Sequence, residues 1–334
     1  MANYPQIDDC SGIWKLKDVK RAVMGGYWRS AAGGTSRGLF IGGDEQPAAS
    51  NVIDFVTIAS TGNATDFGNL TVAKKYIANA AGSHTKVVSG GGQGPDLSNV
   101  IDDIVVAVTA NATDFGDLNQ SIAGIGNSSN ATRALFFGRS APLNQTDYVT
   151  MASKGNAADF GNVNEGKAYH VSFASPTRAI KGSGQSSKNV EFVEIATTGN
   201  GIDFGDLTAF HDMGGAGSSS TRGVFGGGYG PSPFHANGGG VTTIEHITMA
   251  SLGNATDYGD LVVEITHYHG ACNNSVRLLH GGGADSSDNA QDSIEFHTIT
   301  NGGNTVAFGD LTVTRTALGG GSACHGGLND GTGT

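Results

Sequence analysis

Few side chains in this sequence are spaced so that they could do chemistry together. His267, His269 and Cys272 lie close along the chain, and strand alternation would place the two imidazoles on one face. This pattern fits either a metal site or a surface or hydrogen-bonded histidine pair. Residues 90–96 are similar to a calcium-binding nonapeptide but have no tandem partner. With no nucleophile elbow, Ser-His-Asp set or phosphate-binding loop, we expect no catalysis, no cofactor and no metal.

The composition indicates an all-β protein that is rich in turns. Glycine accounts for 54 of 334 residues and charged residues for only 15%. The glycines fall between apolar runs such as residues 39–41 and 101–106, as tight turns between strands require. The net charge of −11 argues against a nucleic-acid partner, because no basic stripe could neutralise phosphates.

The cysteines and the hydropathy of the sequence indicate in which cell compartment the protein is made. The three cysteines, Cys10, Cys272 and Cys324, are odd in number and irregularly spaced, so they do not form a disulfide framework. No apolar stretch reaches the length of a membrane span, and Asp8 and Asp9 interrupt anything like a signal peptide. We therefore expect synthesis in a cytoplasm without a signal peptide, and no membrane insertion.

Two signatures each occur six times, which is the strongest signal in the sequence. Copies of an Asp-Phe-Gly-Asp-Leu type begin at 66, 114, 159, 203, 257 and 307, where the last has Ala in place of Asp. Copies of a cation followed by an apolar strand and small residues begin at 37, 86, 133, 178, 222 and 277. A unit of about 40–50 residues with four short strands has the size of a β-propeller blade.

We name the four strands A to D in chain order. Strand A follows the signature leucine (residues 71–81 in one copy), strand B starts at the cation, strand C is a run such as 53–58, and strand D carries the signature. The first unit lacks strand A, and residues 312–319 form an unpaired one that would complete it. We therefore predict an all-β, six-bladed propeller closed by a C-terminal strand, with a parallel β-helix as the alternative.

The layout of the unit resembles the kelch repeat. A strand ending in Gly-Gly is followed by an acidic residue on the next strand, then an aromatic residue, and then a basic residue before the next unit. The resemblance covers residues from about 34 to 321 and implies architecture, although Phe or Tyr stands where kelch blades usually have Trp. The unit is also similar to the Gly/Asn/Thr-rich kelch-like repeats of tail and fibre proteins of marine bacteriophages. Residues 1–9 and 11–16 resemble lead-in segments of such virion proteins.

The repeated charged residues have two interpretations. They could line a ligand channel, or they could hold each blade to the next through ion pairs or turn hydrogen bonds. Because a residue needed in every blade usually serves the blade, we favour the structural role. The Asn-Ala-Thr-Asp-Phe-Gly stretch is interpreted as a turn in which Asn and Asp bond their own backbone. These structural residues are Arg37, Lys86, Arg133, Arg178, Arg222, Arg277, Asp66, Asp114, Asp159, Asp203 and Asp257.

Length variation points to a binding surface. The distance from each signature to the next cation is 19 or 20 residues, whereas the distance from cation to signature ranges from 25 to 35, so the B–C loops vary. Loops on a rigid scaffold often carry recognition. We predict ligand binding by the longest B–C loop, residues 229–240, and its neighbours 284–292 and 44–50. The alternative is that the loop only tolerates insertion. The candidate ligand-binding residues are Tyr229, Phe234, His235, Asp285 and Asp44.

The first 33 residues have a different pattern from the propeller at 34–334. Apolar residues approximate a helical stripe beside the only two tryptophans, which predicts a short amphipathic helix. We expect this segment to anchor the protein to a particle, the alternative being that it packs on its own propeller. The predicted anchor residues are Trp14, Leu16, Val19, Val23 and Trp28.

The resemblance implies a structural protein of a phage virion, associated with tail or fibre. Its expected partners are other virion proteins and a host cell-surface glycan or protein, with multiple copies per particle and the virion as its location. A cellular kelch-type module for protein–protein interaction is the alternative, and a propeller glycan-active enzyme is a third and weaker one. The sequence does not identify the receptor.

Overall fold

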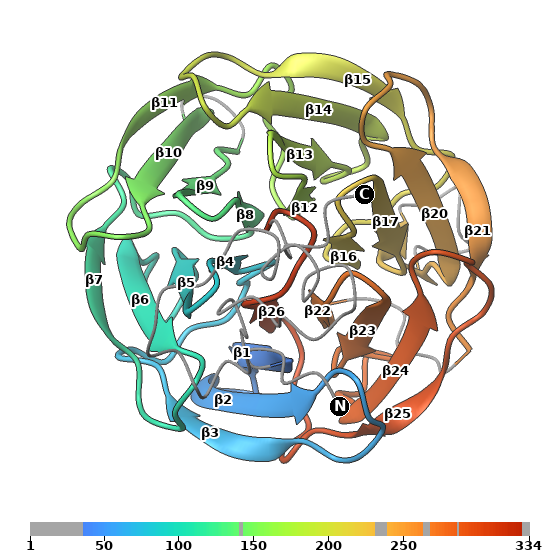
Figure 1. Ribbon diagram of the computed structural model, residues 1–334. Coiled ribbons are helices and arrows are strands. Elements are labelled where there is room, and N and C mark those ends of the chain that lie inside the picture. The colour runs from blue at the N-terminus through green and yellow to red at the C-terminus, as the bar shows by residue number, and fades with distance from the viewer. Residues whose placement is uncertain (1–35, 140–142, 231–238, 263–267, 286, 329–334) are drawn as a thin grey trace, which may run out of the picture.

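The structure is a computed structural model that describes residues 36–139, 143–230, 239–262, 268–285 and 287–328. These residues form six four-stranded antiparallel sheets arranged around a central axis (Figure 1). The described part of the chain contains strands, turns and no helix. The protein is therefore a six-bladed β-propeller. The predicted anchoring helix, with Trp14, Leu16, Val19, Val23 and Trp28, lies outside the described residues.

Each blade runs from an inner strand at the axis to an outer strand at the rim. From inside to outside, blade 1 consists of β26 (Gly319–Ser322), β1 (Arg37–Asp44), β2 (Ala49–Thr57) and β3 (Thr65–Asn69). Blade 2 consists of β4 (Ala81–Gly82), β5 (Lys86–Gly90), β6 (Val100–Val105) and β7 (Thr113–Asp117). Blade 3 consists of β8 (Asn127–Ser129), β9 (Arg133–Phe136), β10 (Gln145–Thr150) and β11 (Ala158–Asn162).

The other three blades repeat this order. Blade 4 consists of β12 (Val171–Ala174), β13 (Arg178–Gly182), β14 (Asn189–Glu194) and β15 (Ile202–Asp206). Blade 5 consists of β16 (Gly215–Ser218), β17 (Arg222–Gly226), β20 (Thr243–Thr248) and β21 (Thr256–Asp260), with β18 (Tyr229–Gly230) and β19 (Gly239–Gly240) paired in its B–C loop. Blade 6 consists of β22 (Gly270–Asn273), β23 (Arg277–Gly281), β24 (Ser293–Thr298) and β25 (Val306–Asp310).

The C-terminal strand closes the ring, as predicted. β26 pairs with β1 in the register Gly38 with Ser322, and so becomes the inner strand of the first blade. The predicted start of strand A is wrong, because the inner strands begin near Ala81 and Gly319 rather than just after the signature. The intervening residues carry the chain from the rim to the axis, a distance that takes several residues even when the chain is extended. We call these segments the D–A crossings.

The signature forms because its glycine allows a bulge. The register between β6 and β7 shifts opposite Gly116, whose φ is 147°. A Cβ at Gly116 would also overlap the backbone of Gly155 in the next blade. The aromatic residue before each glycine fills the space between blades, and Phe115 is buried there against Ile122 and Met151. Most of the core thus lies between sheets, which no single blade could bury alone.

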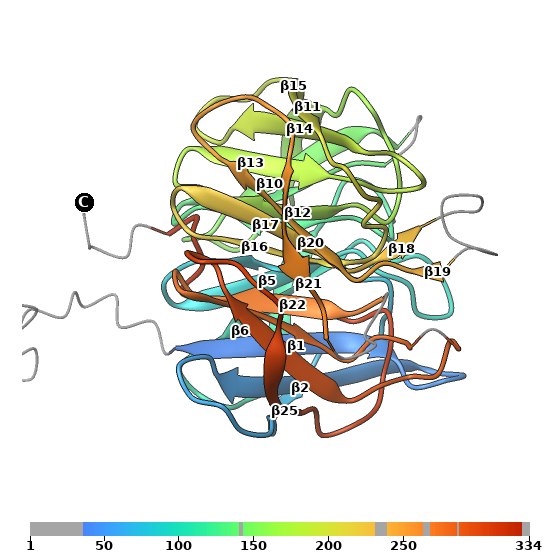
Figure 2. The same cartoon turned by 90° about the vertical axis from the view of Figure 1, so that its right-hand side faces the viewer.

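Strand alternation divides the turns between two faces of the disc. The B–C loops and the D–A crossings lie on one face, which we call the crossing face. The A–B and C–D turns lie on the other, together with the start of β1 at Arg37 and the end of β26 at Ser322, and we call this the terminus face. Figure 2 shows β18 and β19 on the side opposite to the start of β1.

Candidate binding face

Buried carboxylates fix the D–A crossings at the start of each segment. Strand C of every blade supplies one buried Asp or Glu, which accepts a hydrogen bond from the backbone N–H directly after the signature. In blade 2, Asp102 accepts from Thr71 N at 2.8 Å and from its hydroxyl at 2.6 Å. The six carboxylates are Asp54, Asp102, Asp147, Glu191, Glu245 and Glu295.

Buried cations balance three of these carboxylates directly. Lys74 lies 2.8 Å from Asp102, Arg315 lies 2.8 Å from Asp54, and Lys181 lies 3.3 Å from Glu191. Burial lowers the pKa of Lys74, Lys181 and Arg315, and the neighbouring carboxylates oppose that shift. Removing one partner of such a pair leaves a buried charge without compensation, so the crossings are held rigidly.

Farther along, the crossings form a hydrogen-bonded ring around the axis. One residue of each crossing adopts the left-handed conformation, with φ between 51° and 68°. Its N–H donates to the carbonyl oxygen of the equivalent residue one blade back, and five such bonds of 2.6–2.9 Å are present. The six residues are Tyr76, Gly124, Tyr169, Met213, Tyr268 and Ala317. This ring encircles the axis on the crossing face.

Three tyrosines converge where this ring encircles the axis. The ring centroids of Tyr76 and Tyr169 are 5.9 Å apart, and those of Tyr76 and Tyr268 are 6.3 Å apart. All three side chains are half-buried, whereas Met213 and Ala317 are buried. The left-handed conformation costs a non-glycine residue about 1–2 kcal/mol. Strained positions of this kind gather at functional sites, which makes the three tyrosines the leading candidate site.

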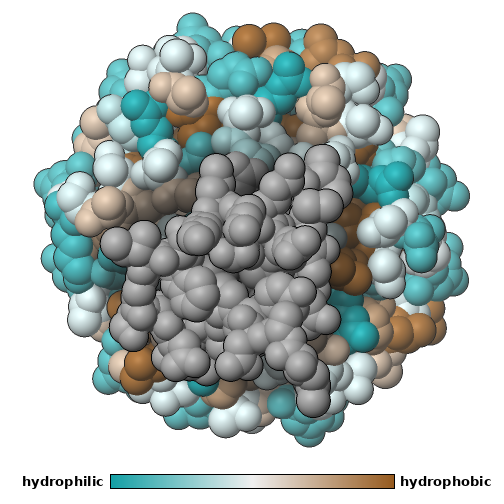
Figure 3. Space-filling model, viewed as in Figure 1, coloured by the Kyte–Doolittle hydropathy of each residue, from teal (hydrophilic) through white to brown (hydrophobic). Residues whose placement is uncertain are grey.

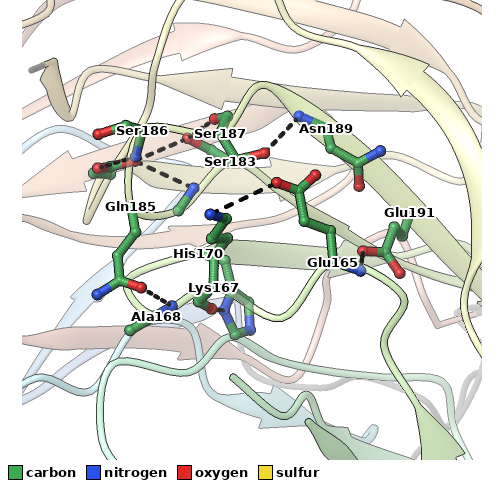
Figure 4. A network of polar contacts seen from close by, with 12 residues as sticks. Glu165, Lys167, Ala168, His170, Ser183, Gln185, Ser186, Ser187, Asn189 and Glu191 are labelled. Carbon is green, nitrogen blue, oxygen red and sulfur yellow. Dashed lines mark hydrogen bonds and ion pairs between the residues drawn. The ribbon is translucent and has the colours of Figure 1, made fainter. Parts of the chain in front are cut away.

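The crossing that carries Tyr169 is held on both sides (Figure 4). Glu165 N donates to Glu191 at 2.7 Å, and Ala168 N donates to the Gln185 side chain of the adjacent B–C loop at 3.2 Å. His170 Nε2 accepts from Gly126 N at 3.0 Å while Nδ1 lies 2.9 Å from the carbonyl oxygen of Lys167. Both bonds are satisfied by a neutral imidazole, and burial lowers the pKa of His170 to about 3.

Asp212 ties the B–C loop of blade 4 to the next crossing. It accepts from Gly184 N at 3.2 Å and from Ser186 N at 3.0 Å, and its backbone oxygen accepts from Tyr229 N at 2.8 Å. Burial raises the pKa of Asp212 to about 6, against the effect of these hydrogen bonds. The B–C loops of blades 4 and 5 are therefore anchored to the crossing that carries Met213, which is the neighbour of Tyr169 in the backbone ring.

The predicted ligand-binding residues are only partly brought together. Asp44 pairs with Lys75 at 2.6 Å, and the Lys75 ammonium lies 5.6 Å from the centroid of the Tyr76 ring. Tyr229 is half-buried at the base of its hairpin. Asp285 accepts from the backbone of its own turn, including Ser287 N at 2.8 Å. Phe234 and His235 lie outside the described residues.

Tyr268 connects the tyrosines with the loops. Burial raises its pKa to about 12, and the charges of Tyr76, Tyr169, Tyr229 and Asp288 contribute in the same direction. Tyr229 and Asp288, from the B–C loops of blades 5 and 6, therefore lie near the tyrosines at the axis. Sequence reasoning found the loops but missed the three tyrosines. Their recurrence six or seven residues after a signature Leu or Val was the available signal.

The repeated cations contact the next blade. In five blades the Arg Nη1 donates to a carbonyl oxygen in the C–D turn of the following blade, and the guanidinium lies over an aromatic ring of its own blade. The acceptors of Arg37, Arg133, Arg178, Arg222 and Arg277 are respectively Val106, Ile195, Met249, Ile299 and Ile58. Lys86 instead pairs with Asp103 of its own blade at 3.1 Å, and Lys154 of blade 3 reaches the same carboxylate at 3.2 Å.

The repeated aspartates do not pair with these cations. Asp66, Asp114, Asp159, Asp203 and Asp257 are exposed on strand D. Three of them, Asp114, Asp159 and Asp257, accept from the glycine two residues later and so support the bulge.

An asparagine three residues before each signature links the blades instead. Its side-chain oxygen accepts the N–H of the last residue of strand D in the preceding blade, at 3.0–3.2 Å, in all six blades. The asparagines are Asn63, Asn111, Asn156, Asn200, Asn254 and Asn304. The turn interpretation of the stretch missed this contact, although the recurring asparagine was visible in the sequence.

On the terminus face the axis is covered by the chain after β26. His325 Nε2 lies 3.0 Å from the carbonyl oxygen of Gly82, and its Nδ1 accepts from Gly327 N at 3.1 Å. Beneath it the inner strands enclose a cavity of about 20 Å³ lined by residues such as Asn127, Ser172 and Ser218. A space of this size holds only one or two waters. The described axis is therefore closed and carries no charged channel.

The structure describes two of the three candidate metal residues, His269 and Cys272. His269 is buried with Nε2 at 3.1 Å from His280 Nδ1, and Cys272 is buried in the core, where burial raises its thiol pKa. His267 lies outside the described residues. Within the residues that the structure describes, no three metal-ligating side chains come together, and residues 90–96 comprise the end of β5 and part of the following B–C loop.

Comparison with known protein families and with curated protein sequences gives no match. In the described ranges no helix is long and apolar enough to cross a membrane. The fold and the geometry of the crossing face are therefore the basis for a functional proposal.

Proposed function

We propose that this propeller is a binding protein of a phage virion, associated with tail or fibre, whose crossing face recognises a host-surface glycan or protein. The phage assignment is based on the resemblance of the repeats and of residues 1–16 to virion proteins. The six-bladed fold is compatible with a kelch-like repeat. In this proposal the repeated charged residues stabilise the propeller and do not bind the ligand. Catalysis is not part of the proposed role.

The observation that carries the proposal is that the propeller begins on one face and has its variable loops on the opposite face. β1 begins on the terminus face, while the variable loops and the three axial tyrosines lie on the crossing face (Figure 2). A protein anchored by the segment before β1 would therefore present its loops away from the anchor. The described terminus face also exposes Val108, Leu252 and Val276 in its turns, and apolar groups are scattered along its rim (Figure 3).

A competition assay tests the proposal. Purified full-length protein should block adsorption of the phage to its host, and mass spectrometry should find the chain in purified virions. Replacing Tyr229, Phe234 and His235 together by alanine should weaken the competition without unfolding, whereas Leu252→Ala on the terminus face should have no effect. A chain absent from virions, bound instead to cellular proteins, would favour the kelch-type interaction module.

A further inference from the structure

The aromatic character of the axial tyrosines is not needed to close the backbone ring. Gly124, Met213 and Ala317 occupy the equivalent positions and make the same type of backbone hydrogen bond. Glycine would adopt this conformation without strain. Since Tyr76, Tyr169 and Tyr268 occupy strained positions that other residue types also fill, their side chains require a separate explanation.

The three rings pack against one another at an angle and leave no cage between them, and we call this cluster the platform. Tyr76 contacts both partners at centroid distances within the usual range for packed aromatic pairs, with interplanar angles of 56° and 70°. A cation could not fit between rings packed at this distance. What remains for a ligand is the outer, half-exposed surface, which offers apolar ring area beside phenolic hydroxyl groups. Tyrosine provides such area with little loss of side-chain entropy.

The charges around the platform disfavour an anionic ligand. Lys75, whose ammonium lies 5.6 Å from the centroid of the Tyr76 ring, is already paired with Asp44, and Lys167, two residues before Tyr169, lies 3.9 Å from Glu165. Asp288 is close enough to contribute to the raised pKa of Tyr268, and Asp212 lies in the adjoining crossing. With a net charge of −11 for the whole chain, sulfated, phosphorylated or sialylated ligands would meet repulsion here.

We propose that Tyr76, Tyr169 and Tyr268 form the platform on which a neutral sugar ring of the receptor stacks. This inference rests on the proposed binding role of the crossing face. The C–H face of a pyranose would pack on the aromatic surface, and its hydroxyls would bond the phenols and the polar groups of the surrounding B–C loops. The Lys75–Asp44 pair at the edge supplies both a donor and an acceptor.

A sugar fits this surface better than a protein does. A stable protein interface buries roughly 800 Å² per partner around an apolar centre. On the described crossing face the large exposed apolar side chains are Val72, Leu97 and Val262, and the aromatic centre consists of the three axial tyrosines with Tyr229 beside them. One aromatic platform with a polar rim is sufficient for one sugar ring.

The test uses full-length protein on an array of neutral and acidic oligosaccharides, followed by calorimetric titration of the best ligand. We expect a neutral oligosaccharide to bind, with a dissociation constant that changes less than about twofold between low and high salt because no ion pair is formed. Tyr169→Gly should weaken binding by at least tenfold while the protein still folds, since glycine adopts the left-handed backbone without strain, as Gly124 does at the equivalent position. Tyr169→Phe should bind within about threefold, and Val72→Ala, on the same face, should bind normally.

Several outcomes would overturn the platform. These are a preference for acidic sugars, a strong salt dependence, or equal loss of binding in Tyr169→Phe and Tyr169→Gly. No glycan binding, with adsorption competition retained, would replace the sugar by a protein receptor and leave the proposed function standing. Loss of the competition itself would contradict the proposed function.

Discussion

Arg277 of blade 6 donates from Nη1 to the carbonyl oxygen of Ile58 in blade 1, at 3.1 Å and across 219 residues of sequence. The same type of contact joins Arg133 to Ile195 between blades 3 and 4. The junction of the two ends is thus built like an ordinary interface between blades. Asn63 accepts from Asp310 N at the same junction, in the way that its counterparts do elsewhere.

We predict that Arg277→Ala and Arg133→Ala destabilise the protein equally. Each loses a charge-assisted hydrogen bond and a cation–π contact, for about 2 kcal/mol in the free energy of unfolding. Urea denaturation followed by circular dichroism measures both. If Arg133→Ala lowered the free energy of unfolding and Arg277→Ala did not, blades 6 and 1 would not be packed against each other.

Deleting residues 312–334 should unfold the whole disc in one cooperative step. The deletion removes β26 together with Arg315, whose guanidinium lies 2.8 Å from buried Asp54. Blade 1 would lose its inner strand, and Asp54 would keep a buried charge without its partner. Calorimetry of the truncated chain provides the measurement. A thermal midpoint equal to that of the full chain would refute closure by the C-terminal strand.

Each of the six asparagines that link neighbouring blades should contribute a similar amount to the free energy of unfolding. Asn156→Ala removes the acceptor of Asp117 N, and we expect a loss of about 1 kcal/mol, the usual net value of one hydrogen bond. Asn254→Ala should cost the same, because Asn254 accepts from Asp206 N in the same way. Ser251→Ala, in an exposed position of the same turn as Asn254, serves as control. Because the contact uses only the acceptor oxygen, Asn156→Asp should keep most of the stability that Asn156→Ala loses. An Asn156→Ala protein as stable as the unchanged chain would contradict the contact between blades.

Stability should fall as the solution becomes acidic. Burial lowers the pKa of His170 to about 3 and those of His297 and His325 to about 4, all from 6.5. The unfolded chain takes up these protons below pH 6.5 while the folded chain does not. The stability is therefore complete above pH 6.5 and is lost progressively down to about pH 3, the folded-state pKa of His170.

Each fully expressed shift corresponds to about 3–5 kcal/mol, the largest being that of His170. Asp212 opposes this trend, since its raised pKa of about 6 makes the folded chain hold a proton that the unfolded chain has released. The pKa of Asp147 is raised as well, but two such acids against five imidazoles with lowered pKa values still leave a net loss of stability. Urea midpoints at pH 7, 5.5 and 4.5 should decline in that order, and His325→Gln should flatten the decline. A midpoint that is constant or rises toward pH 4.5 would contradict the assignment of neutral buried imidazoles.

The propeller could be predicted because its signals are repeated six times. Gly116 and Phe115 recur in kind at fixed spacing, and closure could be inferred from the unpaired segment after the last signature. The residue at which each inner strand begins could not be predicted. The residue types of 71–80 are equally compatible with a strand and with a segment that crosses from the rim to the axis. The tyrosines were missed for a related reason: residue type does not reveal that Tyr76, Tyr169 and Tyr268 share a left-handed backbone conformation at the axis. Only the ring of backbone hydrogen bonds brings them together.

Electron cryomicroscopy of the assembled phage particle tests the central claim most directly. The claim is that the protein is anchored from its terminus face and binds with its crossing face. We expect discs whose terminus face, with Arg37 and His325, points toward the particle, while the three axial tyrosines and the B–C loops point into solvent. Discs that contact the particle through the crossing face, with Tyr76, Tyr169 and Tyr268 covered by another virion protein, would contradict it.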